Sequence, residues 1–335
     1  MKKGVLIVNL GTPDSPSTAD VRKYLRQFLN DPRVIDIPFL YRLLLVNLFI
    51  VPFRAPKSAK LYQKIWTKKG SPLLTNTLLV KEKLQQALGE DYIVEMGMRY
   101  QKPGIEEALK RFKEKNVEIL KIIPLYPQYA SSSTGSTIQK IIEIISKWEV
   151  IPSFKVTSQF YNHPGFIDTW VAIAKGYELQ QYDHFIFSFH GLPERQIKKA
   201  DPSCTCLTDA NCCASINSNN HYCYRATCFE TARVLAERLN IPSDKFTVSF
   251  QSRLGRDPWI KPYSDEVIIQ KAKQGIKRML VFSPAFVADC LETTYEIGTE
   301  YLELFREHGG EQLQLVESLN GHPLWINTLK EIVLE

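Results

Sequence analysis

Residues 184–193 read His184-Phe-Ile-Phe-Ser-Phe-His190-Gly191-Leu192-Pro193. The apolar run between the two histidines has the length of one strand, and its lack of polar alternation is typical of a strand buried on both faces of a parallel sheet. The strand ends on His190, and the glycine and proline that follow predict a turn. An imidazole, with an unperturbed pKa of about 6.5, can accept protons or bind a metal at neutral pH. We therefore predict a catalytic role for His190; the alternative is a core histidine whose ring is hydrogen-bonded internally.

Apolar runs of strand length alternate along the whole chain with segments of helical periodicity. The expected strands are 5–9, 93–98, 118–124, 153–160, 185–189, 246–250 and 279–283. The expected helices are 19–29, 76–88, 104–115, 136–145, 164–180, 228–239, 264–274 and 295–308. Short runs of Val, Ile and Phe joined by crossover helices predict an α/β fold with parallel sheets covered by helices on both faces.

The two halves of the chain contain similar motifs in the same order. In the first half, a strand leads into Arg99-Tyr-Gln-Lys-Pro103 and then into a helix and a further strand. In the second half, a strand leads into Gln251-Ser-Arg-Leu-Gly255, and a helix and a strand follow Pro262. Each half also begins with a strand that runs into a turn containing glycine and proline. We expect two related doubly wound lobes, residues 1–150 and 151–335, with a ligand cleft between them at the carboxyl ends of the strands.

The overall composition is that of an ordinary globular protein, with 44% hydrophobic and 23% charged residues among 335. It excludes an intrinsically disordered chain, and the length allows two domains. The net charge of +6 suits attraction to anionic small molecules or to an anionic membrane face, but it is too diffuse to indicate nucleic-acid binding. The apolar run after Met1 breaks at Gly11, so we recognise no export signal and expect a cytoplasmic location.

The longest apolar stretch is 37–53, which Pro38 and Pro52 bracket. Arg42 and Asn47 interrupt it, so it is too short and too broken for a transmembrane helix. Two interpretations stay open. One is a buried helix; the other is an exposed apolar lip that meets a membrane or an apolar substrate, which the basic residues directly after it support. These basic residues are Arg54, Lys57 and Lys60.

Six of the seven cysteines lie in one segment, 204–228. They are Cys204, Cys206, Cys212, Cys213, Cys223 and Cys228. In a reducing compartment such a cluster favours a metal site over disulfides, with spare thiols or redox pairs as the alternative. No pair has the two-residue spacing typical of zinc ribbons, and only His221 offers an imidazole nearby. Four thiolates could hold a [2Fe–2S] cluster, with a structural zinc as the second candidate. Cys212 and Cys213 are adjacent and project differently, so we expect only one of them to be a ligand.

Two carboxylates follow the last expected apolar strand. Glu292 and Glu296 are four residues apart, so on a helix they share a face, with Asp289 and Cys290 one turn earlier. One interpretation is a solvated helix N-terminus, where the helix dipole favours acids. Because they directly follow the strand that ends at Ser283, we expect the carboxylates to face the cleft instead. There they could bind a hard cation or relay protons.

Taken together, these motifs resemble ferrochelatase, the terminal enzyme of haem synthesis, over essentially the whole chain. The matching stretches are Val8-Asn-Leu-Gly-Thr-Pro-Asp-Ser-Pro16, Met98-Arg-Tyr100, Leu125-Tyr-Pro-Gln-Tyr129, Ser133-Thr-Gly-Ser136, Ser188-Phe-His-Gly-Leu-Pro193, Gln251-Ser-Arg253, Pro258-Trp259 and Phe286-Val-Ala-Asp-Cys-Leu-Glu-Thr293. The resemblance implies two Rossmann-like lobes without a nucleotide and a porphyrin cleft between them. It also implies insertion of ferrous iron into protoporphyrin IX or coproporphyrin III, with release of two protons.

The resemblance also implies roles for single residues. His190 matches the active-site histidine, Glu292 the partner carboxylate across the cleft, and Glu296 the inner acidic line behind it. His190 and Glu292 would contact the Fe²⁺ substrate. The implied substrate-binding residues are Arg99, Tyr100, Tyr126, Ser133 and Trp259. The stretch 37–53 matches an apolar lip that covers the porphyrin and touches the membrane.

The chain departs from some relatives at two places. Cys290 stands where they carry a histidine two residues before the glutamate, which puts a metal-relay role for that position in doubt. The insert 204–228 resembles a bacterial subgroup that holds a [2Fe–2S] cluster through an internal cysteine loop. The implied ligands are Cys206, Cys213, Cys223 and Cys228, with Cys212 as the substitute.

As a mechanism, we expect the cleft to hold the porphyrin bent, so that the nitrogen lone pairs point out of the ring plane. His190 would accept protons from one face, and the two glutamates would desolvate iron or carry protons away. The cluster would be a structural staple, or a sensor of iron or oxidants. Rival functions are a non-catalytic iron–sulfur or haem carrier and a cobalt chelatase of corrinoid synthesis. The sequence leaves open whether the protein is a monomer or a homodimer.

Overall fold

The structure is a computed structural model that describes residues 1–201, 206–208, 211–255 and 257–335. It divides into two compact units, which are described one at a time. Unit 1 comprises Met1–Tyr126, Ala130–Gln159 and Asn320–Glu335, and unit 2 comprises Pro127–Tyr129 and Phe160–Leu319.

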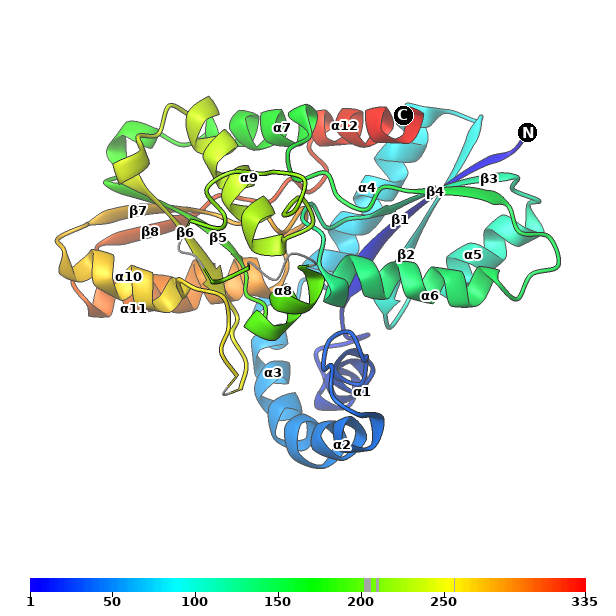
Figure 1. Cartoon of the computed structure of the whole chain (residues 1–335), viewed down its shortest axis with the longest axis horizontal. Coiled ribbons are helices and arrows are strands. Elements are labelled where there is room, and N and C mark those ends of the chain that lie inside the picture. The colour runs from blue at the N-terminus through cyan, green and yellow to red at the C-terminus, as the bar shows by residue number, and fades with distance from the viewer. Residues whose placement is uncertain (202–205, 209–210, 256) are drawn as a thin grey trace. The chain divides into compact units, whose positions relative to one another are not determined.

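Unit 1 is built on a four-stranded parallel sheet in the order β2-β1-β3-β4 (Figure 1). Its strands are β1 (Lys3–Gly11), β2 (Tyr92–Tyr100), β3 (Ile119–Pro124) and β4 (Ser153–Val156). Its helical segments are α1 (Thr18–Leu29), α2 (Phe39–Leu44), η1 (Leu45–Ile50), α3 (Val51–Ile65), α4 (Pro72–Leu88), α5 (Ile105–Glu114), η2 (Ser131–Gly135), α6 (Ser136–Ile145) and α12 (Pro323–Leu334). Helices α5 and α6 pack on one face of the sheet, in a core that includes Leu6, Phe112, Ile122 and Ile141.

Unit 2 repeats the same arrangement, with the parallel strand order β6-β5-β7-β8. Its strands are β5 (His184–His190), β6 (Phe246–Gln251), β7 (Arg278–Phe282) and β8 (Gln312–Leu315). Its helical segments are α7 (Pro164–Ala174), η3 (Leu179–Gln181), α8 (Glu194–Ala200), α9 (Tyr224–Arg238), η4 (Ser243–Lys245), α10 (Ser264–Lys273), η5 (Glu292–Tyr301) and α11 (Leu302–Glu307). The predicted α/β fold with parallel sheets and a repeated topology is confirmed.

The predicted boundary between the lobes, at residue 150, is not where the units divide. Strand β4 pairs with β3, so it completes the sheet of unit 1. Helix α12 also belongs to unit 1, where the Lys83 ammonium at the side of α4 donates to the Gly321 carbonyl at 2.6 Å. Neither β8 nor α12 was expected, and the expected strand 153–160 ends at Val156.

The last helix of each half lies in the unit that the other half builds. Helix α7 follows β4 but belongs to unit 2, and α12 follows β8 but belongs to unit 1. Both helices begin in the same way: the Nδ1 atoms of His163 and His322 accept hydrogen bonds from the backbone N–H two residues on. Their buried positions also correspond one to one. They are Phe166, Ile167, Thr169, Trp170, Ile173 and Ala174 in α7, and Trp325, Ile326, Thr328, Leu329, Ile332 and Val333 in α12. The match supports an internal duplication in which the two halves exchange their final helices.

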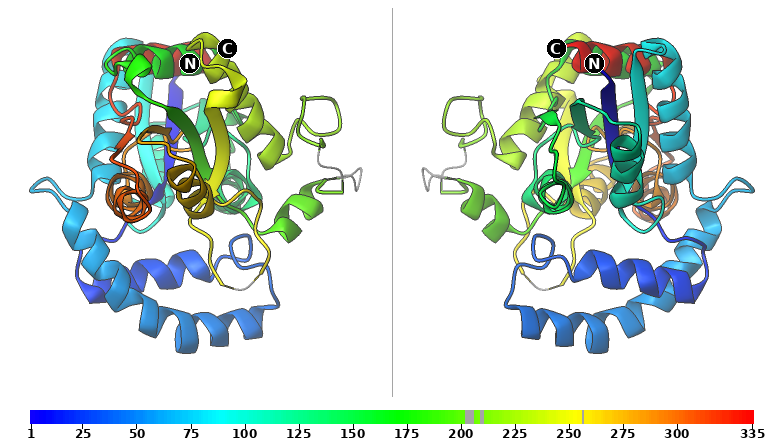
Figure 2. Two further views of the ribbon diagram at one scale, coloured as in Figure 1. Left: turned by 90° about the vertical axis from the view of Figure 1, so that its left-hand side faces the viewer. Right: turned by 90° about the vertical axis from the view of Figure 1, so that its right-hand side faces the viewer.

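Residues 39–65 form one continuous helical segment of unit 1, beside α1 (Figure 2). By length and composition it could cross a membrane, with a mean hydropathy of 1.4 and 22% of its most apolar window buried. Its most exposed apolar residues are Phe39, Leu40, Tyr41, Leu44, Leu48, Phe49 and Phe53. The buried-helix interpretation is therefore wrong. Pro52 stands in the first turn of α3, directly after the π-helix η1.

Candidate active site

His190 is the last residue of β5, and its Cα is paired with that of Gln251 in β6. Its Nδ1 lies 2.6 Å from the carbonyl oxygen of Gly191. A carbonyl can only accept, so the proton of the neutral ring sits on Nδ1 and the lone pair on Nε2. The ring lies beside those of Trp259 and Phe286, with both centroids 6.4 Å away. The structure thus presents Nε2 as a base between aromatic side chains.

The turn after His190 requires a glycine. A Cβ at Gly191 would come within 2.9 Å of the Gln251 carbonyl oxygen and 3.1 Å of the Trp259 ring. The Gly191 N–H donates to the same Gln251 carbonyl at 2.8 Å. Trp259 lies opposite Pro193 in an isolated antiparallel bridge, and its indole N–H donates to the Leu254 carbonyl at 2.9 Å. These contacts place the predicted residues His190 and Trp259 together.

Glu296 is held by donors on both of its oxygens. Oε1 accepts from the Ser252 N–H at 2.9 Å and from the Tyr301 hydroxyl at 3.0 Å. Oε2 accepts from the Ser252 hydroxyl at 2.5 Å and from the Gln251 amide at 3.2 Å. Burial, together with the carboxylate, raises the pKa of Tyr301 far above its ordinary value, so its hydroxyl stays a donor. Glu296 therefore fixes the strand end next to His190.

Glu292 begins the π-helix η5, and its backbone carbonyl accepts from the Gln251 amide at 2.9 Å. Its carboxylate lies against the Cys290 thiol. Burial, and then the charge of Glu292, raise the pKa of Cys290 well above its usual value. Cys290 therefore stays a neutral thiol. The helix expected to carry the two glutamates is, over Glu292–Tyr301, a π-helix. Asp289 is turned to the backbone of Ser318 and accepts from its N–H at 3.1 Å.

A buried chain of hydroxyls sets the orientation of the Gln251 amide. The Ser188 hydroxyl donates to Gln251 Oε1 at 2.7 Å and lies 3.0 Å from the Ser264 hydroxyl, which in turn lies 2.8 Å from Ser249. Because Oε1 accepts from Ser188, the amide nitrogen must face Glu292 and Glu296. Sequence reasoning assigned no role to Gln251; the only available signal was its place in the repeated motif.

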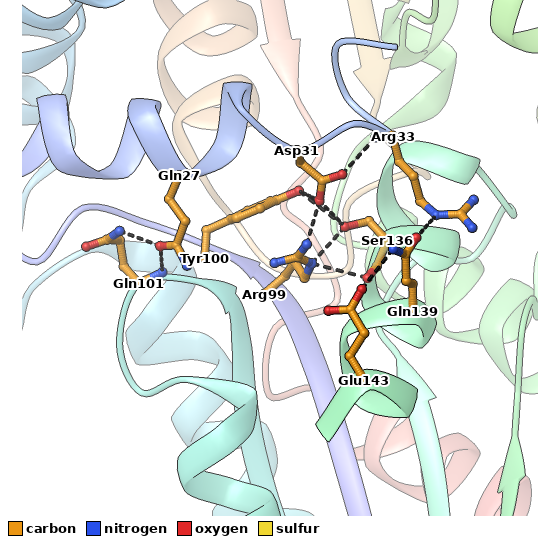
Figure 3. Close-up of polar contacts among 9 residues, drawn as sticks. All are labelled: Gln27, Asp31, Arg33, Arg99, Tyr100, Gln101, Ser136, Gln139 and Glu143. Atoms are coloured by element: carbon orange, nitrogen blue, oxygen red, sulfur yellow. Dashed lines mark hydrogen bonds and ion pairs between the residues drawn. The ribbon is translucent and has the colours of Figure 1, made fainter. Parts of the chain in front are cut away.

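Two of the predicted residues of unit 1, Arg99 and Tyr100, contact a buried aspartate (Figure 3). Asp31 is 6% exposed, and its Oδ2 accepts from Arg99 at 2.5 Å, from Tyr100 at 2.9 Å and from Ser136 at 2.5 Å. The Arg99 Nε donates to the Ser136 hydroxyl at 2.7 Å. Burial, and then Asp31, raise the pKa of Tyr100. Arg99 and Tyr100 are thus held rigidly by a residue that sequence reasoning missed.

The remaining predicted residues of unit 1 lie in the loop and helix after β3. The Tyr126 hydroxyl is buried beside Thr137, and burial raises its pKa. Ser133 lies in η2, half-buried, and its N–H bonds to the Ala130 carbonyl at 3.3 Å. Both the loop after β3 and the loop after β7 therefore continue as π-helices, a feature that is frequent at functional sites.

The cysteine segment gathers its thiols in unit 2, although Cys204 lies outside the described residues. The Sγ atoms of Cys206 and Cys223 are 3.6 Å apart, as are those of Cys212 and Cys213. The Arg225 guanidinium donates to Cys213 Sγ at 3.1 Å. All the cysteines that the structure describes are free of disulfides. Across the described ranges, His, Cys, Asp and Glu side chains form no group of three placed to hold a metal ion.

Three of the described thiols, those of Cys206, Cys213 and Cys228, have raised pKa values. Burial raises the pKa of Cys206 to about 11, and the neighbouring Cys223 and then burial raise that of Cys213. Cys228 is fully buried, and its pKa is raised by burial. Two thiolates bound to one tetrahedral metal at about 2.3 Å lie roughly 3.7 Å apart. The separation of 3.6 Å between Cys206 and Cys223 fits that requirement.

Comparisons with known proteins agree with one another. The family model described as "Ferrochelatase" matches residues 2–335. The chain is 46% identical to a ferrochelatase of Coxiella burnetii over 332 residues, covering 99% of this chain and 93% of that protein. It is 45% identical to a ferrochelatase of Legionella pneumophila over 335 residues, covering 100% and 99%. Two structures of SirB, from Bacillus subtilis with Fe³⁺ and from its subspecies spizizenii with cobalt, share the fold. Their TM-scores are 0.57 and 0.56 at 12% and 11% identity, and each comparison covers 100% of this chain and 95% of SirB.

Proposed function

The chain belongs to the ferrochelatase family, which inserts ferrous iron into a porphyrin in haem biosynthesis, and from this premise we propose which residues perform the reaction. The enzyme is a lyase whose substrates are the porphyrin and Fe²⁺. The observation that carries the assignment is the joined group of His190, Gln251 and the two glutamates at the carboxyl ends of β5 and β6.

His190 is the base that accepts pyrrole protons. Two N–H protons must leave the ring before iron is fully bound, and Nε2 carries the lone pair that can take them. A positioned base typically contributes 10²–10⁴-fold to rate. Trp259 and Phe286, beside the imidazole, offer apolar surface to an aromatic macrocycle. Binding energy from this surface would supply the few kcal/mol needed to hold the ring bent, with its lone pairs out of plane.

Glu292 is the residue whose carboxylate contacts the Fe²⁺ substrate. Its neighbour Cys290 is a neutral thiol and a weak donor, so the carboxylate oxygens keep lone pairs for a hard cation. Glu296 differs because four donors already occupy it, and its role is to hold Gln251 and Ser252 and to pass protons along that network. Arg99, Tyr100, Tyr126 and Ser133 of unit 1 are proposed as porphyrin-binding residues.

We propose a [2Fe–2S] cluster on Cys206, Cys213, Cys223 and Cys228, with Cys212 as the substitute. The support is the 3.6 Å approach of the Cys206 and Cys223 sulfurs; in the described ranges no third side chain joins them in a metal-binding arrangement. A bound cluster would fix the segment by metal–thiolate bonds, so its role here is a structural staple. Structural zinc is the alternative. Anaerobic purification followed by absorption spectroscopy and iron and zinc analysis separates the two.

The stretch 37–53, most of which lies in the helical segment 39–65, is proposed to be the apolar lip that touches the cytoplasmic face of a membrane. Its exposed apolar side chains and the following Arg54, Lys57 and Lys60 have the composition of an interfacial helix. Binding to vesicles with and without anionic lipid tests this proposal; equal recovery in the supernatant with both would contradict it.

The decisive experiment adds Fe²⁺ anaerobically to the protein with protoporphyrin IX or with coproporphyrin III and follows porphyrin fluorescence. Fluorescence that falls over many turnovers supports the assignment and identifies the porphyrin. Tight porphyrin binding without metal insertion would favour the carrier, and faster insertion of Co²⁺ into a corrinoid precursor would favour the cobalt chelatase.

A further inference from the structure

Tyr224 lies within the cysteine segment, and its side chain contacts the backbone of the active-site histidine. It is the first residue of α9, directly after Cys223, which occupies the N-cap position of that helix. Its side chain is 7% exposed, and its hydroxyl donates to the backbone carbonyl of His190 at 2.8 Å. The contact joins residues 34 positions apart in the chain.

The His190 carbonyl lies at the end of β5, where the pairing of strands supplies few hydrogen-bond donors. In a trans peptide the N–H and C=O point in opposite directions. The Gly191 N–H points to Gln251 of β6, so the His190 carbonyl points away from β6. On its other side, β5 pairs with β7 only as far as Phe187 with Phe282. The Tyr224 hydroxyl therefore supplies a partner beyond the end of the strand pairing.

This hydrogen bond bears on the imidazole because the ring is held by the same stretch of backbone. The His190 Nδ1 contacts the Gly191 carbonyl at 2.6 Å, within the adjoining peptide. The peptide between His190 and Gly191 is thus fixed by Gln251 at its N–H and by Tyr224 at its carbonyl. A rotation of that peptide would turn Nε2 away from its present direction.

The neighbours of Tyr224 in the chain contact cysteine sulfurs. Cys223 lies 3.6 Å from Cys206, sulfur to sulfur, and Arg225 donates to Cys213. The residues immediately before and after Tyr224 therefore both contact other cysteines of the segment. Any change in the state of these thiols acts on the helix start that carries the tyrosine.

We infer that Tyr224 is a positioning residue for His190 and that it couples the cysteine segment to the reaction. The inference rests on the proposed role of His190 as the base. It adds that the thiols influence the rate through the direction of the imidazole and not through electron transfer.

The first test is Tyr224→Phe, which keeps the ring and removes the hydroxyl. We expect kcat to fall about tenfold with an unchanged KM for porphyrin, because a buried carbonyl loses its donor while the binding surface stays intact. The acid limb of the pH profile of kcat/KM should shift, and the ring signals of His190 in the nitrogen NMR spectrum of the metal-free protein should move. The matched control is Tyr222→Phe, whose ring is 45% exposed on the far side of Cys223 and should alter none of these.

The second test asks whether the cysteines act through Tyr224. Cys213→Ser should slow the wild-type enzyme but add little in the Tyr224→Phe background, since coupled sites are non-additive. If Tyr224→Phe does not fold, hydrogen exchange of the Gly191 amide in the wild-type protein replaces it, before and after chelator treatment under reducing conditions. Faster exchange after treatment supports the coupling.

The inference would be overturned if Tyr224→Phe had the kinetics, the pH profile and the His190 signals of the wild-type protein. It would also be overturned if chelator treatment left the exchange of the Gly191 amide unchanged. Either result would leave the enzyme assignment intact. Failure of the proposed function is recognised separately, because the wild-type protein itself would then insert no iron.

Discussion

Replacing Glu296 by glutamine should destabilise the protein by about 1–2 kcal/mol. Glutamine has nearly the same shape, but one of its two terminal groups donates. The Ser252 N–H and the Gln251 amide are obligate donors, and each donates to a different oxygen of Glu296. Either orientation of the new amide therefore places its NH₂ group, also a donor, against one of them. The favoured orientation gives up the longer bond to Gln251, at 3.2 Å, and turns the two bonds on the other oxygen from charged to neutral.

The Gln251 amide cannot relieve this conflict by turning over. Its oxygen accepts from Ser188, and a flip would bring that oxygen against the carbonyl of Glu292. The loss therefore stays local and should be smaller than that of Glu296→Ala, which leaves all four donors without their acceptor.

Thermal unfolding measures the effect. In domains of 150–250 residues, 1 kcal/mol shifts Tm by about 2–4 °C, so a fall of about 2–8 °C is expected for Glu296→Gln. Glu303→Gln is the matched control, because it makes the same charge change at an exposed position in α11 and should stay within about 0.5 kcal/mol of wild type. An unchanged Tm in Glu296→Gln, or an alanine variant no worse than the glutamine variant, would refute the reasoning.

His190→Ala should lose at least about 99% of iron-insertion activity with its Tm unchanged within about 2 °C, and a residual rate above a tenth of wild type would remove His190 as the base. Gly191→Ala should lower both activity and Tm, because the new Cβ meets the Gln251 carbonyl at 2.9 Å; a wild-type rate and Tm would contradict this. Burial, and then Lys271, lower the pKa of His184 to about 4, so its contribution to stability is present above pH 6.5 and is lost as the pH falls towards 4. The loss amounts to about 3 kcal/mol, and Tm measured from pH 7 to 4 should fall less in His184→Asn than in wild type. Anaerobic chelation of the metal proposed on the cysteines should lower Tm. An equal Tm with and without metal would contradict the proposed structural role of the cluster.

Local patterns were enough to predict the sheets. The runs 5–9, 118–124, 185–189 and 279–283 all form inner strands of the two sheets, because a predominantly apolar run of strand length is typical of a strand buried on both faces. His190 at the end of its strand was found in the same way, since the turn chemistry follows it directly in sequence. The roles of His190 and of the glutamates in the reaction stay predictions.

The parts that were missed depend on distant residues. Asp31 organises the unit 1 site, yet its partners lie 68, 69 and 105 positions away, and no local pattern distinguishes it from a surface aspartate. In the sequence the apolar stretch is bracketed by Pro38 and Pro52, whereas the helical segment continues through Pro52 to Ile65. Strand β8 is too short, at four residues, for periodicity to reveal it.

The exchange of α7 and α12 has a consequence for biosynthesis. Unit 1 contains residues from the start of the chain, but the helix that packs beside α4 is Pro323–Leu334. During translation the first unit must therefore wait, with that surface uncovered, until more than 160 intervening residues have been made, since Gln159 is followed in this unit by Asn320. Domains usually fold in the order in which they leave the ribosome. Here the nascent first half cannot finish early, so the two halves should complete their folding together, and chaperones that shield apolar surface should engage the unfinished chain until residue 334 has emerged.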